Sequence, residues 1–319
     1  MAGTIDGQGL QTCGAVATKT GRAGLLQLDC ARLTSAAWRQ LSAGLQSFAR
    51  DPDVYCTILE LLSGSQKDLV EISPNELAAA YAGLWSIDRF NKPQVALIEG
   101  KAEWGAMALA VNGTHRVADP AATFAIADVA GGIVPGWGAS FWLPALPGRL
   151  GLYMALTGGS IDAALAYRHG WLTHRIESAQ FAEIGERLAQ AEPVDALLDG
   201  LDLGPASSSL DARLAAIEHC FSAPDPSEIV ARLDALWGAD ADWAKTAANA
   251  MRAAPLPALA VTRQLLTAHA QPTLRDGLVM DFRVASNWRE YGPAELAKLF
   301  APPDGGDLPL PAQLPPSIS

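Results

Sequence analysis

A short turn between an apolar run and an apolar helix is the first place in the sequence suited to holding a ligand. Residues 100 to 113 read GKAEWGAMALAVNG and directly follow the apolar run at residues 95 to 98. The first backbone N–H groups of a helix have no partner within it, so they can face a ligand. The pattern therefore predicts backbone donors near Gly105, although the bulky Trp104 stands beside it. Close packing of the helix against the strand would also explain this glycine.

Residue types that usually bind metals are dispersed along the chain. The closest histidines, His169 and His174, are five residues apart, and the four cysteines show no CxxC spacing. A helical metal site usually needs ligands three or four residues apart. We therefore expect no bound metal, and we interpret the cysteines as buried apolar thiols in a reducing compartment.

The composition is that of a globular protein with a large core. Half of the 319 residues are hydrophobic, 18% are charged, and the formal net charge is −11. A negative chain without a dense Lys/Arg cluster repels phosphate backbones, so nucleic acid is not an expected partner. Single cations such as Lys101 can still bind one phosphate group of a small anionic molecule.

The sequence shows neither a membrane-spanning segment nor a recognisable signal peptide. Its apolar runs are shorter than a bilayer requires, and the start MAGTIDGQGLQ has neither a basic region nor an apolar core. We therefore predict a cytoplasmic protein without a membrane partner.

Strands and helices alternate in the first half of the chain. Residues 14 to 30 predict a β-hairpin, and Thr34 can cap a helix whose apolar residues recur at helical spacing. Further strands are predicted at 55–62, 94–98, 115–118 and 123–126, with helices at 74–90 and from about 105. This order favours an α/β fold with crossover connections.

The second half of the chain is helical in character. Two segments end at Gly158-Gly159 and at Gly170, and later helices are predicted at 226–237, 243–253, 257–269 and 273–288. The expected organisation is a core at 1–185, a helical region at 186–300, and a Pro-rich tail at 301–319 that does not fold on its own.

Several ordered motifs together resemble the crotonase (enoyl-CoA hydratase/isomerase) superfamily over residues 14 to 176. They are KPQVALIEG, the turn around Gly105, HRVADPAATFAIADVAGGIVPGWG and LPALPGRLGLYMALTGGSIDAALAYRHGWLTHRI. The later segments IEHCFSAPDPSEIVARLDA and ADWAKTAANAMRAAPLPALAVTRQLLTAHAQPTLRDGLVMDFRVA resemble the 3-hydroxyisobutyryl-CoA hydrolase branch. The resemblance implies a spiral of ββα units followed by a C-terminal helical region.

The resemblance implies an acyl-CoA thioester as substrate, with coenzyme A as part of that substrate and no tightly bound cofactor. Negative charge then develops on the thioester oxygen, and two N–H donors stabilise it. Gly105 matches the first donor and Ser65 the second, while Asp68 matches the end of the loop motif that carries the second donor. Asp128 matches the acid/base position, where it acts as a base or as a nucleophile.

The chain departs from the family pattern around the substrate. Gly136 stands where the hydrolase branch carries an Asp, and Ala108 stands where a hydratase carries its first carboxylate. Trp104 replaces a glycine, so pocket size is in question, and Lys101 and Asp68 are the other predicted substrate contacts. Asp is one methylene shorter than the Glu usual at residue 128, and a displacement of about 1 Å can cost on the order of a hundredfold in rate.

Three functional hypotheses remain open from the sequence. The first is an acyl-CoA thioester hydrolase, and the second is a hydratase, isomerase or C–C bond-forming crotonase. The third is a non-catalytic subunit or acyl-CoA-binding protein, because the usual second carboxylate and the glycine-rich loop are missing. Asp128 is also typical of a plain turn or cap carboxylate. The resemblance further implies a homo-oligomer, a trimer or hexamer.

Overall fold

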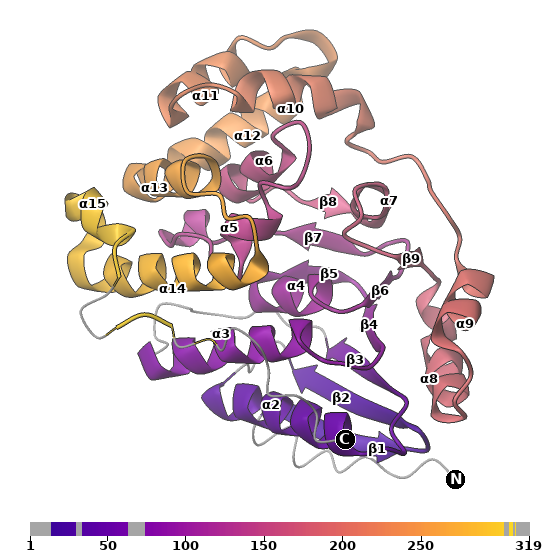
Figure 1. Ribbon diagram of the computed structural model, residues 1–319. Helices are drawn as coiled ribbons and strands as arrows, with labels where there is room; N and C mark the ends of the chain where they lie inside the picture. The colour runs from indigo at the N-terminus through magenta and orange to yellow at the C-terminus, as the bar shows by residue number, and fades with distance from the viewer. Residues whose placement is uncertain (1–13, 30–33, 63–73, 303–305, 309, 311–319) are drawn as a thin grey trace. The chain divides into compact units, whose positions relative to one another are not determined.

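The computed structural model describes residues 14–29, 34–62, 74–302, 306–308 and 310 (Figure 1). The chain divides into two compact units. Among the described residues, the first unit comprises those between 14 and 123 and those at 162–206, and the second comprises 124–161 and those between 207 and 310. These units differ from the three regions expected from the sequence because residues 124–161 pack with the C-terminal helices rather than with the N-terminal sheet.

The first unit is built on a six-stranded sheet with the order β1-β2-β3-β4-β6-β9. Its strands are β1 (Ala15–Thr20), β2 (Ala23–Asp29), β3 (Cys56–Leu62), β4 (Gln94–Ile98), β6 (His115–Ala118) and β9 (His174–Arg175). β1 and β2 form the predicted antiparallel hairpin, with Ala17 opposite Leu26. The other neighbours are parallel, which confirms the crossover connections expected from the alternating elements.

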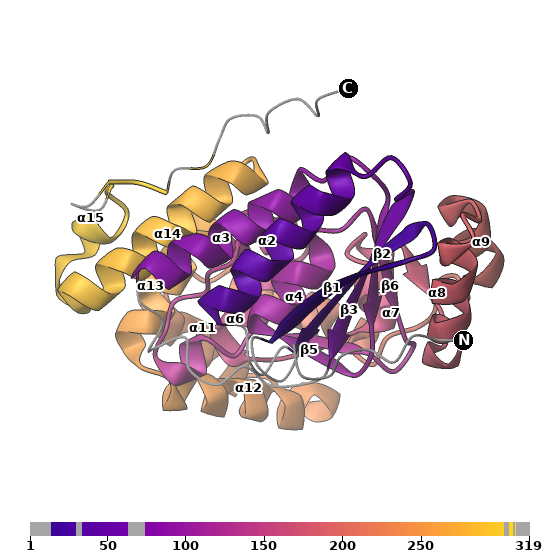
Figure 2. The same ribbon diagram turned by 90° about the horizontal axis from the view of Figure 1, so that it is seen from below.

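Helices cover both faces of this sheet (Figure 2). On one face lie α2 (Ser35–Arg50), α3 (Pro74–Asp88) and α4 (Trp104–Val111), and on the other lie α8 (Phe181–Ala189) and α9 (Val194–Leu201). Thr34 begins α2 as predicted, because its hydroxyl accepts the N–H of Ala37 at 3.2 Å. A side chain at Gly24 of β2 would overlap Phe48, so this glycine allows α2 to lie close to the sheet.

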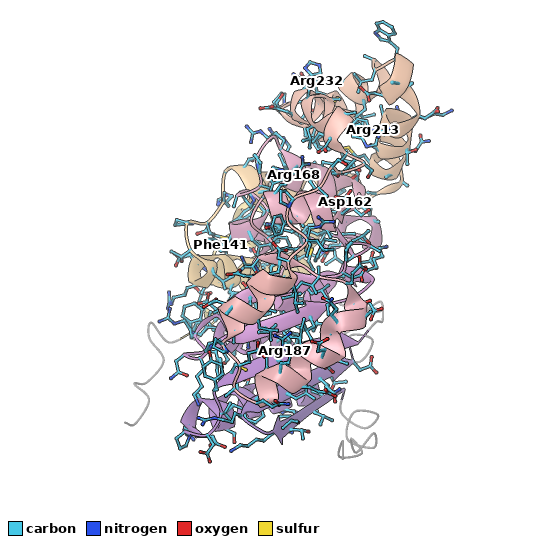
Figure 3. All side chains as sticks on the ribbon, turned by 90° about the vertical axis from the view of Figure 1, so that its right-hand side faces the viewer. Phe141, Asp162, Arg168, Arg187, Arg213 and Arg232 are labelled. Carbon is cyan, nitrogen blue, oxygen red and sulfur yellow. The ribbon has the colours of Figure 1, made fainter. Side chains whose placement is uncertain are left out.

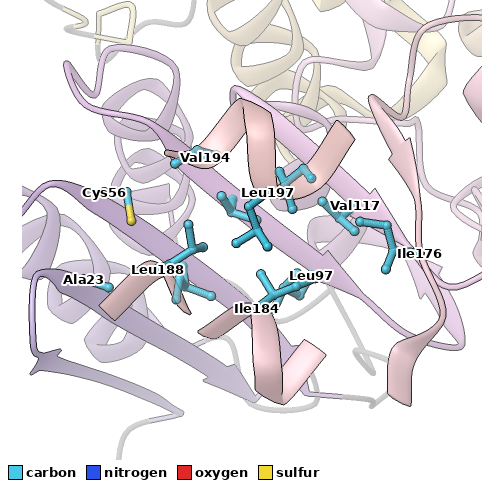
Figure 4. Packing of buried hydrophobic residues seen from close by; sticks show 12 residues of the cluster. Ala23, Cys56, Leu97, Val117, Ile176, Ile184, Leu188, Val194 and Leu197 are labelled. Atoms are coloured by element: carbon cyan, nitrogen blue, oxygen red, sulfur yellow. The ribbon is translucent and has the colours of Figure 1, made fainter. Parts of the chain in front are cut away.

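The core of the first unit lies between the sheet and the helices α8 and α9 (Figure 4). Central strand residues Ile58, Val95 and Val117 are at most 3% exposed, and Ile184 and Leu188 of α8 are fully buried against them. Each such side chain contributes about 1.5–3 kcal/mol relative to an exposed one.

Short elements complete the first unit and lead into the second. They are β5 (Lys101–Glu103), β7 (Thr123–Ala125), β8 (Ile161–Asp162), η4 (Ser178–Gln180) and α7 (Ala163–Arg168), whose ends are marked by Asp162 and Arg168 in Figure 3. The carboxylate of Asp162 caps α7 by accepting the N–H of Leu165 at 2.9 Å.

The second unit is helical and includes the loop region before α6 (Leu150–Thr157). Its other elements are η3 (Val129–Gly131), α5 (Ala139–Trp142), η5 (Asp211–Arg213), α10 (Leu214–Phe221), α11 (Pro226–Asp234), η6 (Gly238–Asp240), α12 (Ala241–Ala253), α13 (Leu256–Thr267), α14 (Leu274–Tyr291), η7 (Gly292–Glu295) and α15 (Leu296–Leu299). Arg232 of α11, labelled in Figure 3, donates to the carbonyl of His219 in α10 at 2.9 Å and thereby links the two helices. Gly158 ends α6 with φ +68°, the left-handed conformation that glycine adopts without strain.

The close approach of α6 to Leu143 depends on a glycine. A Cβ atom at Gly151 would overlap the backbone carbonyl of Leu143. We therefore expect Gly151→Ala to lower the free energy of unfolding by about 1–3 kcal/mol, the range for overpacking a core. Urea unfolding would measure it, with Gly200→Ala in α9 as the control because nothing lies within 4 Å of a Cβ there. Equal stability of the two variants would contradict the prediction.

The architecture confirms the fold class expected from the sequence, a mixed α/β arrangement followed by a helical C-terminal region. Within the described parts of the chain, no helix is both long and apolar enough to cross a lipid bilayer.

Candidate functional site

Gly105 lies in the first turn of α4, within the first unit, and is buried. The residue before the helix, Glu103, makes no side-chain capping bond to it. Its carboxylate instead pairs with the ammonium of Lys101 at 2.6 Å. The start of α4 therefore receives no hydrogen bond from its capping side chain, which fits the backbone-donor role predicted for Gly105.

The structure describes only some of the other residues that were predicted to contact the substrate in the first unit. Ser65 and Asp68 lie outside the described residues, so the second oxyanion donor stays a prediction. Trp104 is the first residue of α4, and its side chain is outside the description too. The Lys101 side chain is 59% exposed and ion-paired with Glu103, so its role as a substrate contact also stays a prediction.

Asp128 lies between β7 and η3 in the second unit. Its carbonyl accepts the N–H groups of Gly131 and Ile133, each at 3.0 Å, which closes the turn after the strand. The residue is 2% exposed and occupies the N-cap position of η3, yet its side chain makes no capping bond. The backbone of Asp128 therefore forms the turn, while the carboxyl group has no part in it.

The surroundings of the Asp128 carboxyl favour its protonated form. Burial raises the pKa of Asp128 to about 8, its own backbone N–H lowers it, and the negative charge of Asp281 raises it again. Its Oδ1 atom is buried without a hydrogen-bond partner among the residues that the structure describes. A carboxyl group with such a displaced pKa is typical of an acid/base site.

Asp281 of α14 is the site residue that sequence reasoning did not single out. It is 1% exposed, and burial raises its pKa to about 7, although hydrogen bonds from residues 138 to 140 oppose that rise. The N–H of Ser140 donates to Oδ2 of Asp281 at 3.4 Å. The second unit therefore contains two buried carboxyl groups that interact, Asp128 and Asp281.

A signal for Asp281 was present in the sequence. At helical spacing it falls on the apolar face of α14 that includes Leu274, Leu278 and Val284. A single charged residue on an otherwise buried helical face has to be compensated or neutralised, so this pattern indicates a candidate site residue.

The loop that holds Gly136 is fixed by its tryptophans. Gly136 is buried, and Trp137 follows it with φ +65°, an uncommon value for a residue with a side chain. The indole N–H of Trp142 donates to the carbonyl of Trp137 at 3.2 Å, and the two side chains are 6% and 2% exposed. Both tryptophans therefore belong to the packed interior that holds this loop.

A pocket of about 190 Å³ lies elsewhere in the second unit. Its lining includes Arg149, Glu218 and Leu266, whereas Asp128 is not part of it. No group of three or more His, Cys, Asp or Glu side chains within the described ranges is arranged to hold a metal ion.

The structure thus brings Asp281 to the loop that follows Gly136 and close enough to Asp128 to affect its ionisation. Gly105 is described separately, in the first unit. The parallel sheet with crossover helices makes the first unit a mixed α/β structure. In the second unit the buried carboxyl of Asp128, whose pKa is raised, is the candidate site residue.

The chain belongs to the enoyl-CoA hydratase/isomerase family, whose model matches residues 31–294. The match confirms the crotonase superfamily suggested by the sequence motifs. The family match and the curated relatives also confirm that the chain is an enzyme of this superfamily.

Curated relatives with similar sequences are 3-hydroxyisobutyryl-CoA hydrolases. The mitochondrial protein of Homo sapiens is 27% identical over 295 residues, which cover 84% of this chain and 76% of that protein. The mitochondrial protein of Rattus norvegicus is 26% identical over 302 residues, covering 86% and 78%. These relatives support the branch to which the C-terminal segments pointed.

Two solved structures share the fold over most of the chain. One is a carnitinyl-CoA dehydratase from Mycobacterium thermoresistibile, with TM-score 0.81 and 23% identity, covering 92% of this chain and 98% of that one. The other is an enoyl-CoA hydratase from Rhodobacter sphaeroides 2.4.1, with TM-score 0.79 and 22% identity, covering 92% and 99%. At such identities the likeness establishes the fold alone.

Proposed function

We propose that this protein hydrolyses acyl-CoA thioesters of 3-hydroxy acids, with Asp128 as the reacting carboxyl group. The observation that carries the proposal is the buried Asp128 side chain, which forms no capping bond in its own turn and has a pKa of about 8. The curated 3-hydroxyisobutyryl-CoA hydrolases support the choice of reaction.

In the proposed reaction the ionised Asp128 carboxylate takes a proton from a water molecule. The water oxygen then bonds to the thioester carbon, the C–S bond breaks, and the coenzyme A sulfur leaves and is protonated. Direct attack by the carboxylate, followed by hydrolysis of the resulting anhydride, gives the same products. The oxyanion-donor role predicted for Gly105 is a separate part of this proposal.

Release of free thiol from 3-hydroxyisobutyryl-CoA tests the proposal directly. The purified chain should release coenzyme A well above the rate of a sample without protein, and it should do so faster than it hydrates an enoyl-CoA. Hydration without thiol release would favour the hydratase hypothesis. Binding of acyl-CoA in calorimetry with no turnover would favour the non-catalytic one.

The pH dependence of the reaction should follow the ionisation of Asp128. Its pKa is raised to about 8, and only the ionised form can accept a proton or attack. We therefore expect kcat/KM to rise about tenfold per pH unit below pH 8 and to level off above it. Initial rates between pH 6 and 9.5 would measure this, and a profile that falls as pH rises would assign Asp128 the role of an acid.

We also propose a cytoplasmic homo-oligomer, a trimer or hexamer, as the family resemblance implies. Light scattering on the purified chain would give its mass in solution, and a monomer would remove that part of the proposal.

A further inference from the structure

A short sequence occurs twice in the first unit, as THRV at residues 114–117 and as THRI at residues 173–176. The two copies stand at the starts of β6 and β9, which are parallel neighbours at one edge of the sheet. The imidazole rings of His115 and His174 are stacked, with centroids 6.3 Å apart and planes inclined by 24°. The repeat therefore places two imidazoles side by side.

The threonine of each copy is bonded to the neighbouring strand in the same way. The hydroxyl of Thr114 accepts the N–H of Gln94 at 2.8 Å and donates to the carbonyl of that residue at 3.0 Å. The hydroxyl of Thr173 accepts the N–H of Arg116 at 2.8 Å and donates to its carbonyl at 3.2 Å. A hydroxyl has a single proton, and in both copies the strand carbonyl receives it.

Each imidazole lies between its threonine and a carboxylate of α9. Nε2 of His115 is 2.8 Å from Oδ1 of Asp195, and Nε2 of His174 is 3.1 Å from Oδ1 of Asp199. Nδ1 lies 3.0 Å from the hydroxyl oxygen of the preceding threonine in the first copy and 2.8 Å from it in the second. Both ring nitrogens of both histidines therefore have a polar partner.

These contacts together fit the protonated form of both rings. A carboxylate only accepts hydrogen bonds, so each Nε2 has to carry a proton. The threonine proton is donated to the strand carbonyl, so each Nδ1 has to donate as well. A ring with two N–H groups is the charged imidazolium. Two such rings repel each other, and the two carboxylates offset that repulsion.

The carboxylates come from one side of α9. Asp195 and Asp199 are four residues apart and therefore neighbours on the helix surface. Leu197 of the same helix belongs to the buried cluster of the sheet, together with Val117 and Ile176 (Figure 4). After the helix, Asp202 accepts a backbone N–H of β9 at 2.7 Å. Apolar packing and the two His–Asp pairs thus hold α9 against β6 and β9.

Other charged groups on the packed elements are engaged elsewhere or exposed. β4 carries no charged residue. The remaining groups are Arg116 of β6, bonded to the carbonyls of Gly113, Gly170 and Trp171, Arg175 of β9, bonded to the carbonyl of Gly204, Arg187 of α8, paired with Glu183 and Glu192, Asp202, which accepts the hydroxyl of Tyr167, and the exposed Arg168 of α7 and Glu186 of α8.

We propose that His115 and His174 form a proton-dependent clasp that holds α9 on the sheet. While both rings are protonated, two ion pairs fasten the helix. When a ring loses a proton, its pair loses its attraction, and the threonine hydroxyl has to turn from the strand carbonyl to the bare ring nitrogen. Imidazoles change charge between about pH 5 and 8, so α9 opens more often as pH rises through this range. The clasp operates whether or not the chain hydrolyses a thioester.

Hydrogen exchange of the α9 amides in the full chain tests the clasp. Protection factors correct for the pH dependence of exchange itself, and the amides of α2, on the opposite face of the sheet, report opening of the whole unit. The side chains of Asp195 and Asp199 are 86% and 75% exposed, so water screens both pairs. Relative to α2, we therefore expect α9 protection to fall by only about two- to fivefold per pair between pH 5.5 and 8.

The double variant Asp195→Asn/Asp199→Asn removes both carboxylates while keeping the size of the side chains. Its α9 protection relative to α2 should already be low at pH 5.5 and should not change with pH. Glu186→Gln is the matched control because it removes an exposed carboxylate from the neighbouring α8, and it should keep the pH dependence of the wild type.

Two results would overturn the clasp. One is a wild-type chain in which α9 protection relative to α2 is the same at pH 5.5 and pH 8, a measurement that needs no variant to fold. The other is a double variant that retains the wild-type pH dependence, because the carboxylates of α9 would then have no part in it.

Discussion

Asp128→Asn is expected to reduce kcat/KM for thioester hydrolysis by about 10²–10⁴-fold, the usual contribution of a general acid or base. Asn has nearly the same size but cannot accept a proton or attack as a carboxylate. The measurement belongs at pH 9, above the pKa of about 8, where most of the wild-type Asp128 is ionised. At this pH the rate of the variant is compared with that of a wild type whose Asp128 is mostly in the reactive, ionised form.

Asp242→Asn is the control for this comparison because Asp242 is an exposed carboxylate of α12 in the same unit. It should retain wild-type kcat/KM. Rates in Asp128→Asn within a factor of about two of the wild type would remove Asp128 from the mechanism and would return its carboxyl to a structural role. Residual activity of the variant is expected from binding and oxyanion stabilisation alone.

Much of the fold could be predicted because local patterns and tertiary packing agree. Thr34 caps α2 where the apolar spacing begins, and the predicted hairpin forms as the antiparallel pair β1–β2. The glycines at 158 and 170 end helices in the left-handed conformation that they were expected to adopt. The division into units could not be read from the sequence, because it depends on which helices residues 124–161 pack against.

Only the candidate site residues that lie within a sequence motif could be predicted. Asp128 comes directly after β7 and within a recognisable motif, so its position could be inferred from order alone. Asp281 comes from α14, whose close approach to Phe141 of α5 depends on the missing side chain of Gly277. Pairs of residues far apart in sequence carry no local pattern, so only the packed structure shows them.

The buried state of Asp128 should also make the protein less stable as pH rises. The folded-state pKa of about 8 lies above the ordinary 3.8, so between these values the folded chain keeps a proton that the unfolded chain has released. Stability is therefore fully present below about pH 4 and is lost progressively up to about pH 8. Protonating an ordinary aspartate at pH 7 costs about 4 kcal/mol.

Asn at residue 128 avoids that cost, so Asp128→Asn should be more stable than the wild type by about 4 kcal/mol at pH 7, with the gap closing near pH 4. Urea unfolding at pH 4, 5.5, 7 and 8 would measure the free energy of unfolding, with Asp242→Asn expected to follow the wild type throughout. If the two proteins differ in free energy of unfolding by the same amount at every pH, the variant's higher stability comes from packing rather than from ionisation. A stability difference that grows with pH, together with the loss of activity, is the trade-off between stability and activity that a buried catalytic acid should show.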